Sequence, residues 1–194
     1  MIRIGEAGPL YNRNGWDYTS ELMVRSVASV KAMLTSLTKT AEEHGKYIIF
    51  RTWSVGVGEV GNMHTDPAVY ERVLGDIYSD NLIISTKLTK GDFWNSVPFN
   101  PTLYSGRHKR IVELQARREF EAFNVIPNYV APDYEGALRG FMEKNPNVIG
   151  VWVWTQAGGP IRQGPMMIYP FRGHWLWTDA NVFASAMIAA HPGE

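Results

Sequence analysis

The sequence has 194 residues and contains no cysteine, no long apolar run and no excess of charge of either sign. The absence of cysteine excludes disulfide bonds, thiolate metal ligands and cysteine nucleophiles. Lys and Arg together number 19, and so do Asp and Glu, so no net field attracts nucleic acid or an anionic membrane surface. Any charged ligand must therefore be bound by a local group of charged residues.

The N-terminal residues MIRIGEAGPLYN lack the apolar core of a signal peptide. No apolar run elsewhere is long enough to span a bilayer, so we expect no membrane partner and, by default, a cytoplasmic location. The hydrophobic content of 45% and the charged content of 20% are typical of a globular protein. We expect a single domain over residues 1–194 that buries a sizeable core.

Apolar runs that read as strands alternate with segments of helical period. The expected strands are Ile2–Gly5, Tyr47–Trp53, Leu82–Leu88, Arg110–Ala116 and Val148–Trp154. The expected helices are 20–43, with Thr19 or Ser20 as N-cap and Gly45 after its end, 67–79, with Asp66 as N-cap, 133–144 and 179–190. Residues 89–108 have no helical period and contain two prolines, which predicts a long loop, often a functional feature.

This alternation predicts right-handed βαβ units and a parallel sheet. An open doubly wound sheet fits, and so does part of a (β/α)8 barrel. Five units are too few to close an eight-stranded barrel. We expect an α/β fold, a partial TIM-type barrel of about five βα units.

Two other kinds of site have little support. Gly56–Gly61 matches the GxGxxG dinucleotide pattern, but the next helix is expected only near Asp66 and the next strand ends in a lysine rather than an acidic residue. The five histidines lack metal-binding spacing, and no GxSxG serine motif is present. We expect no cofactor and no metal.

Charged residues lie in and just after the strands, where a sheet covered on both faces has apolar side chains. In parallel architectures the carboxyl ends of the strands meet at one edge, where ligand sites form. The residues at this expected edge are Glu6, Arg51, Lys87, Asp92, Glu113, Glu119, Trp154 and Gln156.

Paired carboxylates beside aromatic rings are typical of glycoside hydrolysis, in which one carboxylic acid protonates the leaving oxygen and a second group activates water or attacks the sugar. Arg51 and Lys87 are not needed for a neutral sugar, but they would suit a substrate with its own carboxylate. Indole rings such as Trp53 and Trp94 can stack on sugar rings, although closing gaps over a core is their more frequent role.

Several segments in this order resemble the catalytic barrel of the glycoside hydrolase family 67 α-glucuronidases, which remove (4-O-methyl)glucuronic acid from xylan-derived oligosaccharides with inversion. These segments are IGEAGPLYN, IIFRTW, NLIISTKLTKGDF, VELQARREF and FRGHWLWTDANVFASAMIAAHP. The helix after the first segment, the glycine-rich loop and the strand WVWTQAGGP depart from the family pattern.

The resemblance implies a role for each matching residue. Glu6 corresponds to the general acid, and Asp92 and Glu119 correspond to the carboxylates that activate water. Arg51 and Lys87 correspond to the residues that bind the uronate carboxylate. Glu113 either supports Glu119 or is itself the base. Trp53, Trp94, Trp154 and Gln156 complete the substrate-binding residues that we expect.

The resemblance begins at the fourth barrel strand, so the first three strands have no counterpart here. An open half-barrel exposes strand edges and an apolar inner face, which is unfavourable in a monomer. We therefore expect a homodimer or higher homo-oligomer. The alternative to an enzyme is a non-catalytic carbohydrate-binding half-barrel whose tryptophan-lined edge holds sugar.

Overall fold

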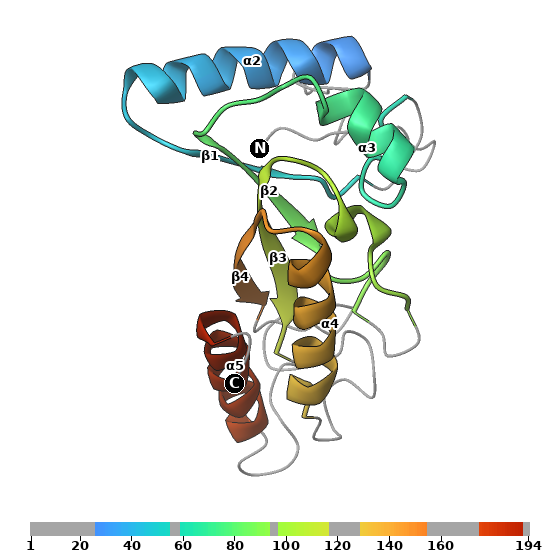
Figure 1. Ribbon diagram of the computed structural model, residues 1–194, viewed down its shortest axis with the longest axis vertical. Helices are drawn as coiled ribbons and strands as arrows, with labels where there is room; N and C mark the ends of the chain where they lie inside the picture. The colour runs from blue at the N-terminus through green and yellow to red at the C-terminus, as the bar shows by residue number, and fades with distance from the viewer. Residues whose placement is uncertain (1–25, 55–58, 94–96, 117–128, 155–174, 192–194) are drawn as a thin grey trace, which may run out of the picture. The chain divides into compact units, whose positions relative to one another are not determined.

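The computed structural model describes residues 26–54, 59–93, 97–116, 129–154 and 175–191. The expected strand Ile2–Gly5 lies outside these residues. The described strands are β1 (Ile48–Arg51), β2 (Leu82–Lys87), β3 (Lys109–Gln115) and β4 (Val148–Trp154). They form a four-stranded parallel sheet in the order β1-β2-β3-β4, flanked by helices (Figure 1). The expectation of a mixed α/β fold with parallel strands is confirmed.

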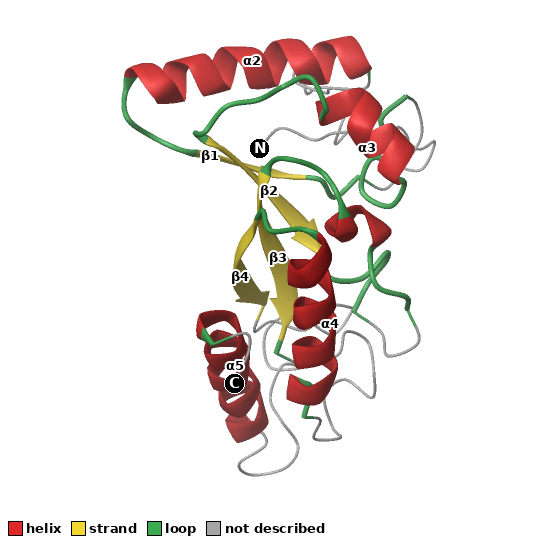
Figure 2. Cartoon of the chain, in the orientation of Figure 1, coloured by secondary structure: helices red, strands yellow, loops and turns green. Residues whose placement is uncertain are grey.

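The described helices are α2 (Val27–Glu43), α3 (Pro67–Leu74), α4 (Ala131–Lys144) and α5 (Trp175–Ala190), with a short 3-10 helix, η1 (Pro101–Tyr104) (Figure 2). The chain divides into two compact units. The first comprises residues 1–86 and 105–110, and the second comprises 87–104 and 111–194. The expectation of one domain stays a prediction, and each unit is described separately.

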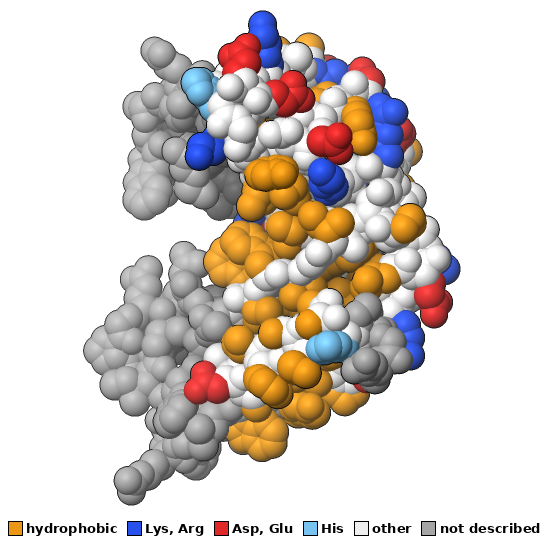
Figure 3. Space-filling view, turned by 60° about the vertical axis from the view of Figure 1, so that its left-hand side comes forward, with side chains coloured by type: hydrophobic (Ala, Val, Ile, Leu, Met, Phe, Trp, Pro, Cys, Tyr) orange, Lys and Arg blue, Asp and Glu red, His pale blue; other side chains and the backbone are white. Residues whose placement is uncertain are grey.

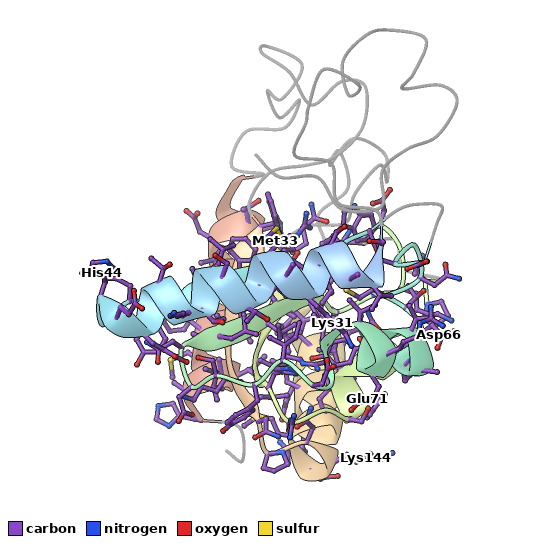
Figure 4. All side chains as sticks on the ribbon, turned by 90° about the horizontal axis from the view of Figure 1, so that it is seen from above. Lys31, Met33, His44, Asp66, Glu71 and Lys144 are labelled. Atoms are coloured by element: carbon purple, nitrogen blue, oxygen red, sulfur yellow. The ribbon has the colours of Figure 1, made fainter. Side chains whose placement is uncertain are left out.

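Helix α2 begins later than the sequence predicts. Its N-cap is Ser26, whose side chain accepts a hydrogen bond from the Ser29 amide at 3.1 Å, whereas Thr19 and Ser20 lie outside the described residues. The end is as predicted. Gly45 has a φ of 59°, and the amides of Gly45 and Lys46 bond back to the Glu42 and Ala41 carbonyls. This pairing is a Schellman motif, in which glycine adopts the left-handed conformation without steric cost. Figure 4 shows α2 from above, with His44 at its end.

Helix α3 starts where predicted and stops early. Asp66 caps it by accepting hydrogen bonds from the Ala68 and Val69 amides at 2.8 and 3.3 Å, and Pro67 occupies the first turn, where a missing N–H costs nothing. The helix ends at Leu74 rather than near residue 79, because Gly75 follows and glycine is a poor helix former.

The core of the first unit lies between α2, α3 and one face of β1 and β2. Phe50 of β1 pairs with Ile84 of β2, and both are buried against Leu34 of α2. The neighbouring pair Ile49 and Ile83 points to the other face, where Ile49 is 60% exposed. This alternation follows from the two-residue period of a strand.

The core of the second unit lies between β3, β4 and helices α4 and α5. Val112 and Leu114 of β3 are buried against Leu138 and Phe141 of α4. Helix α4 begins two residues before its predicted start, and α5 begins four residues before its own. The expected loop 89–108 contains η1 and an isolated bridge between Thr89 and Phe99. The long-loop prediction is therefore only partly correct.

Candidate functional site

Lys87 is the last residue of β2 and is 4% exposed. Its Nζ lies 3.2 Å from Asp92 Oδ1 and 4.4 Å from the centre of the Phe93 ring. The Asp92 side chain is 42% exposed, so the pair joins a buried cation to a carboxylate that solvent can reach. A buried lysine at a strand end needs such partners, because removing an unpaired ammonium group from water costs several kcal/mol.

The segment after β2 holds Asp92 in place through backbone hydrogen bonds. The Leu88 amide donates to the Glu113 carbonyl of β3 at 2.9 Å. The Asn100 amide returns to the Leu88 carbonyl at 2.8 Å, and the Lys90 amide bonds to the Pro98 carbonyl at 3.0 Å. Asp92 therefore follows directly on a segment that is anchored to the sheet.

Glu113 lies in the middle of β3 and is fully buried. Its Oε2 accepts a hydrogen bond from the indole Nε1 of Trp154, the last residue of β4, at 3.3 Å. Next to it, the Trp152 ring lies 5.3 Å from the Trp154 ring, tilted by 55°, and Trp152 is 44% exposed. The buried carboxylate thus orients one ring of an aromatic pair whose other ring reaches solvent.

Arg51 and Trp53 lie in the first unit. The Arg51 guanidinium carbon is 5.7 Å from the centre of the Trp53 ring, and the Trp53 ring packs edge-on against His64 at 5.0 Å. His64 is buried, and its Nδ1 lies 3.1 Å from the Thr52 hydroxyl. Polar side chains therefore collect just after β1 as well.

The predicted site residues fall into three groups. Lys87, Asp92, Glu113 and Trp154 belong to the second unit, where they form two pairs, Lys87–Asp92 and Glu113–Trp154. Arg51 and Trp53 belong to the first unit, so the joint action of Arg51 and Lys87 on one carboxylate stays a prediction. Residues outside the described part of the chain are Glu6, Trp94, Glu119 and Gln156.

The glycine-rich segment does not open a helix in its described part. After Gly61 the chain makes turns, and α3 begins only at Pro67. Val60 and Met63 are fully buried in the core of the first unit. The helix N-terminus that a dinucleotide fingerprint requires directly after the glycines is missing there.

Sequence reasoning missed a buried polar cluster in the first unit. The Tyr70 hydroxyl lies 3.0 Å from His108 Nδ1, and His108 Nε2 lies 2.7 Å from the Ile77 carbonyl. A carbonyl only accepts, so Nε2 carries the proton and Tyr70 donates to Nδ1. The fully buried Arg110 places its guanidinium carbon 4.5 Å from the centre of the Tyr70 ring. The motif GRHKR gave the only signal, by placing basic residues at the start of a buried strand.

Burial governs the ionisation of this cluster. Desolvation raises the pKa of Tyr70 to about 12, although the neighbouring Arg110 charge works in the opposite direction. Desolvation also lowers the pKa of His108, with smaller contributions from Arg110 and Arg107, while its bond to the Ile77 carbonyl opposes the shift. The cluster is thus held as a neutral phenol and a neutral imidazole beside a buried guanidinium, an arrangement suited to positioning β3.

Among the described residues, no three His, Asp or Glu side chains are close enough together to hold a metal ion. Likewise, none of the described helices combines the length and the apolar character needed to cross a membrane. The described residues define a mixed α/β protein with charged and aromatic groups at the ends of its strands. The chain matches no family model, and no curated protein matches it.

Proposed function

We propose that this chain is the catalytic portion of a glycoside hydrolase that acts on uronic-acid-containing oligosaccharides, built on part of a (β/α)8 barrel. The observation that carries the proposal is the Lys87–Asp92 pair, with its 3.2 Å contact, in the same unit as the buried Glu113–Trp154 pair. The resemblance to the family 67 α-glucuronidases supports the same assignment through the order of the segments.

In the proposed reaction, Asp92 and Glu119 activate a water molecule that attacks the anomeric carbon, and Glu6 protonates the leaving oxygen. Water adds from the face opposite the departing sugar, so the configuration inverts. An inverting acid and base lie roughly 6.5 to 9.5 Å apart, which leaves room for the water. No cofactor takes part.

The half-exposed state of Asp92 supports its role as a base, because a base must be reached by water and by substrate. Lys87 suits two tasks. Its charge holds Asp92 at the end of β2, and a lysine ammonium can also pair with a substrate carboxylate.

Glu113 suits a supporting role better than that of base. Its side chain is fully buried and accepts a hydrogen bond from the Trp154 indole N–H. We therefore assign it the positioning of Trp154, which would stack on a sugar ring.

A carbohydrate-binding module without catalysis is the second candidate. The observation that favours it is the partly exposed Trp152 beside Trp154, since tilted indole rings provide flat surfaces for sugars.

The test measures release of uronic acid from glucuronic-acid-substituted xylo-oligosaccharides by the wild type, by Asp92→Asn and by Asp76→Asn. Asp76 is a matched control, because it also pairs with a lysine, Lys31, at 2.7 Å in the first unit. Loss of a general base typically costs 100-fold to 10,000-fold in rate. We expect this loss for Asp92→Asn and near wild-type activity for Asp76→Asn.

Equal activity of Asp92→Asn and the wild type would reject the catalytic assignment. If no variant releases product while the oligosaccharide still quenches tryptophan fluorescence, the binding module is the correct function. Binding lost on Trp152→Ala would then locate the sugar.

A further inference from the structure

Helix α5 has an unusual distribution of side chains. Its buried side chains in the described structure are polar, namely Thr178, Asn181 and Ser185. Three of its large apolar side chains are exposed, with Trp177 at 41%, Phe183 at 67% and Met187 at 44%, whereas Ile188 packs partly buried against the core of the second unit. A helix on the surface of a globular protein normally shows the opposite arrangement.

Hydrogen bonds explain why the polar side is buried. Asn181 accepts from the Val130 amide at 3.1 Å and donates to the Ala116 carbonyl at 2.6 Å. Ser185 donates to the Asn181 carbonyl at 2.7 Å. Asn181 thus joins the end of β3 to the start of α4. Turning the apolar side of α5 inward would break the two Asn181 bonds and leave the Val130 amide and the Ala116 carbonyl unsatisfied, which favours the outward orientation of the apolar side.

A hollow of about 400 Å³ lies beside this apolar side, between the start of α4 and α5. Its walls include Tyr129, Pro132 and Glu135 on one side and Ala180, Phe183 and Met187 on the other. Among the described residues that line the hollow, Glu135 is the one with a charge, and it already pairs with Arg139 at 2.6 Å. Figure 3, in which α5 comes forward, shows hydrophobic side chains gathered over this region, with charged ones mostly toward the edges.

We propose that a second copy of this chain docks on this surface, which we call the α5 face, to form a two-fold dimer. A two-fold interface uses the same patch on both copies, so a projection and a matching hollow must lie on one surface. The α5 face has both, because the strongly exposed Phe183 stands at the rim of the hollow. Phe183 of each copy would enter the hollow of the other.

The spacing of residues on α5 suits helix packing. Trp177, Ala180, Ala184 and Met187 follow one another at steps of three, four and three, the pattern of a helix seam that faces a second helix. The two alanines leave room for a close approach at the centre of this seam. Two α5 helices can therefore pack against each other over about three turns.

The available area is large enough for the core of a dimer interface. An aromatic side chain buries about 150–250 Å². At their exposed fractions Trp177, Phe183 and Tyr129 together present on the order of 300 Å². A stable interface needs about 800 Å² from each partner, and these three side chains would form its centre.

Charge argues for a protein partner of apolar character. Helix α5 contains no Lys or Arg, and the lining of the hollow contains none either. Helices that lie on membrane surfaces carry basic residues on their polar side, and nucleic-acid sites need them as well. The inference does not depend on the proposed enzymatic activity.

The test is light scattering on the purified chain. We expect the wild type to have twice its chain mass of 21.9 kDa. Phe183→Glu should raise the dissociation constant of the dimer at least tenfold, because it places a charge in an apolar hollow. Ile49→Lys is the control, since Ile49 is an exposed apolar residue on β1, an edge strand of the sheet. A monomeric wild type, or a dimer that Ile49→Lys disrupts and Phe183→Glu does not, would overturn the proposal.

A second measurement tests the proposal without relying on Phe183→Glu, which could fail to fold. Because the chain has no cysteine, Ala180→Cys introduces a unique thiol at the centre of the α5 face. A short bismaleimide should link two copies of Ala180→Cys, whereas Leu37→Cys, at an exposed position on α2, should stay unlinked. Failure of Ala180→Cys to link, or equal linking of both variants, would contradict docking at α5. The dimer proposal would also be contradicted if this chain dimerised only when fused to additional residues, because a segment of those residues would then be what covers the α5 face.

Discussion

Replacing Tyr70 with Phe tests the buried polar cluster of the first unit. The hydroxyl donates to His108 Nδ1 at 3.0 Å, and the Tyr70 side chain is 2% exposed. Phe keeps the ring and its contact with the Arg110 guanidinium, but it leaves the imidazole acceptor without its donor and removes the hydroxyl that hydrogen-bonds with Arg110. Leaving one buried polar group unsatisfied costs about 1–3 kcal/mol. We therefore expect Tyr70→Phe to lower the free energy of unfolding by this amount at pH 7–9.

The pH dependence gives a sharper expectation. Burial raises the pKa of Tyr70 from 10.0 to about 12. This rise corresponds to about 3 kcal/mol in favour of the neutral phenol. The unfolded chain loses the proton near pH 10, whereas the folded chain keeps it to about pH 12. The stability from this group is therefore complete below pH 10 and is lost as the pH rises toward 12. By pH 11 about half of it, roughly 1 kcal/mol, should be gone.

The assay is urea unfolding of the wild type and Tyr70→Phe at pH 9 and pH 11. The difference in unfolding free energy between the two proteins cancels the titration of the other groups. We expect the advantage of the wild type to shrink by about 1 kcal/mol between these pH values. Tyr78→Phe, at a tyrosine that is 58% exposed, is the control for removing a hydroxyl at the surface. A difference that stays constant from pH 9 to pH 11 would refute the account of Tyr70.

Three further predictions concern stability and can be measured by urea unfolding. Burial lowers the pKa of His108 in the folded state, so its contribution to stability is complete above pH 6.5 and falls as the pH drops toward the folded value. His108→Gln should therefore flatten the acid side of the stability profile. Gly106→Ala should destabilise the protein by at least about 1 kcal/mol, because Gly106 has a φ of 96° and a Cβ there would lie 2.9 Å from the Arg110 guanidinium. By contrast, Gly136→Ala should stabilise the protein by up to about 1 kcal/mol, because the added Cβ on α4 would lie in open space. Asn181→Ala should cost about 2–5 kcal/mol, because two buried backbone groups lose their partner; a cost below 0.5 kcal/mol would contradict its bridging role.

The sequence was sufficient to predict the strands of the described part and the ends of several helices. Val148–Trp154 was predicted to the residue, because an apolar run between a helix stop and a turn has few alternatives. Asp66 and Gly45 were identified as end residues, because capping chemistry is local. The start of α2 was missed, because serines recur along this segment and only the structure distinguishes the one that caps it.

The sequence could not predict which charges pair across space. The contact between Lys87 and Asp92 was within reach, because five residues at a strand end stay close. The bond between Trp154 and Glu113 joins two strands that are far apart in sequence, and no local pattern encodes it. The Tyr70–His108 pair is equally distant, and the polar buried side of α5 runs against the usual hydrophobic pattern.

The most direct test of the proposed function follows the anomeric form of the released uronic acid by proton NMR. The substrate is an α-linked glucuronosyl xylo-oligosaccharide and the protein is the wild-type chain. Inverting hydrolysis predicts that free glucuronic acid appears first as the β anomer and then equilibrates. Initial release of the α anomer would contradict the inverting mechanism, and no release of uronic acid would contradict the assignment as a glycoside hydrolase.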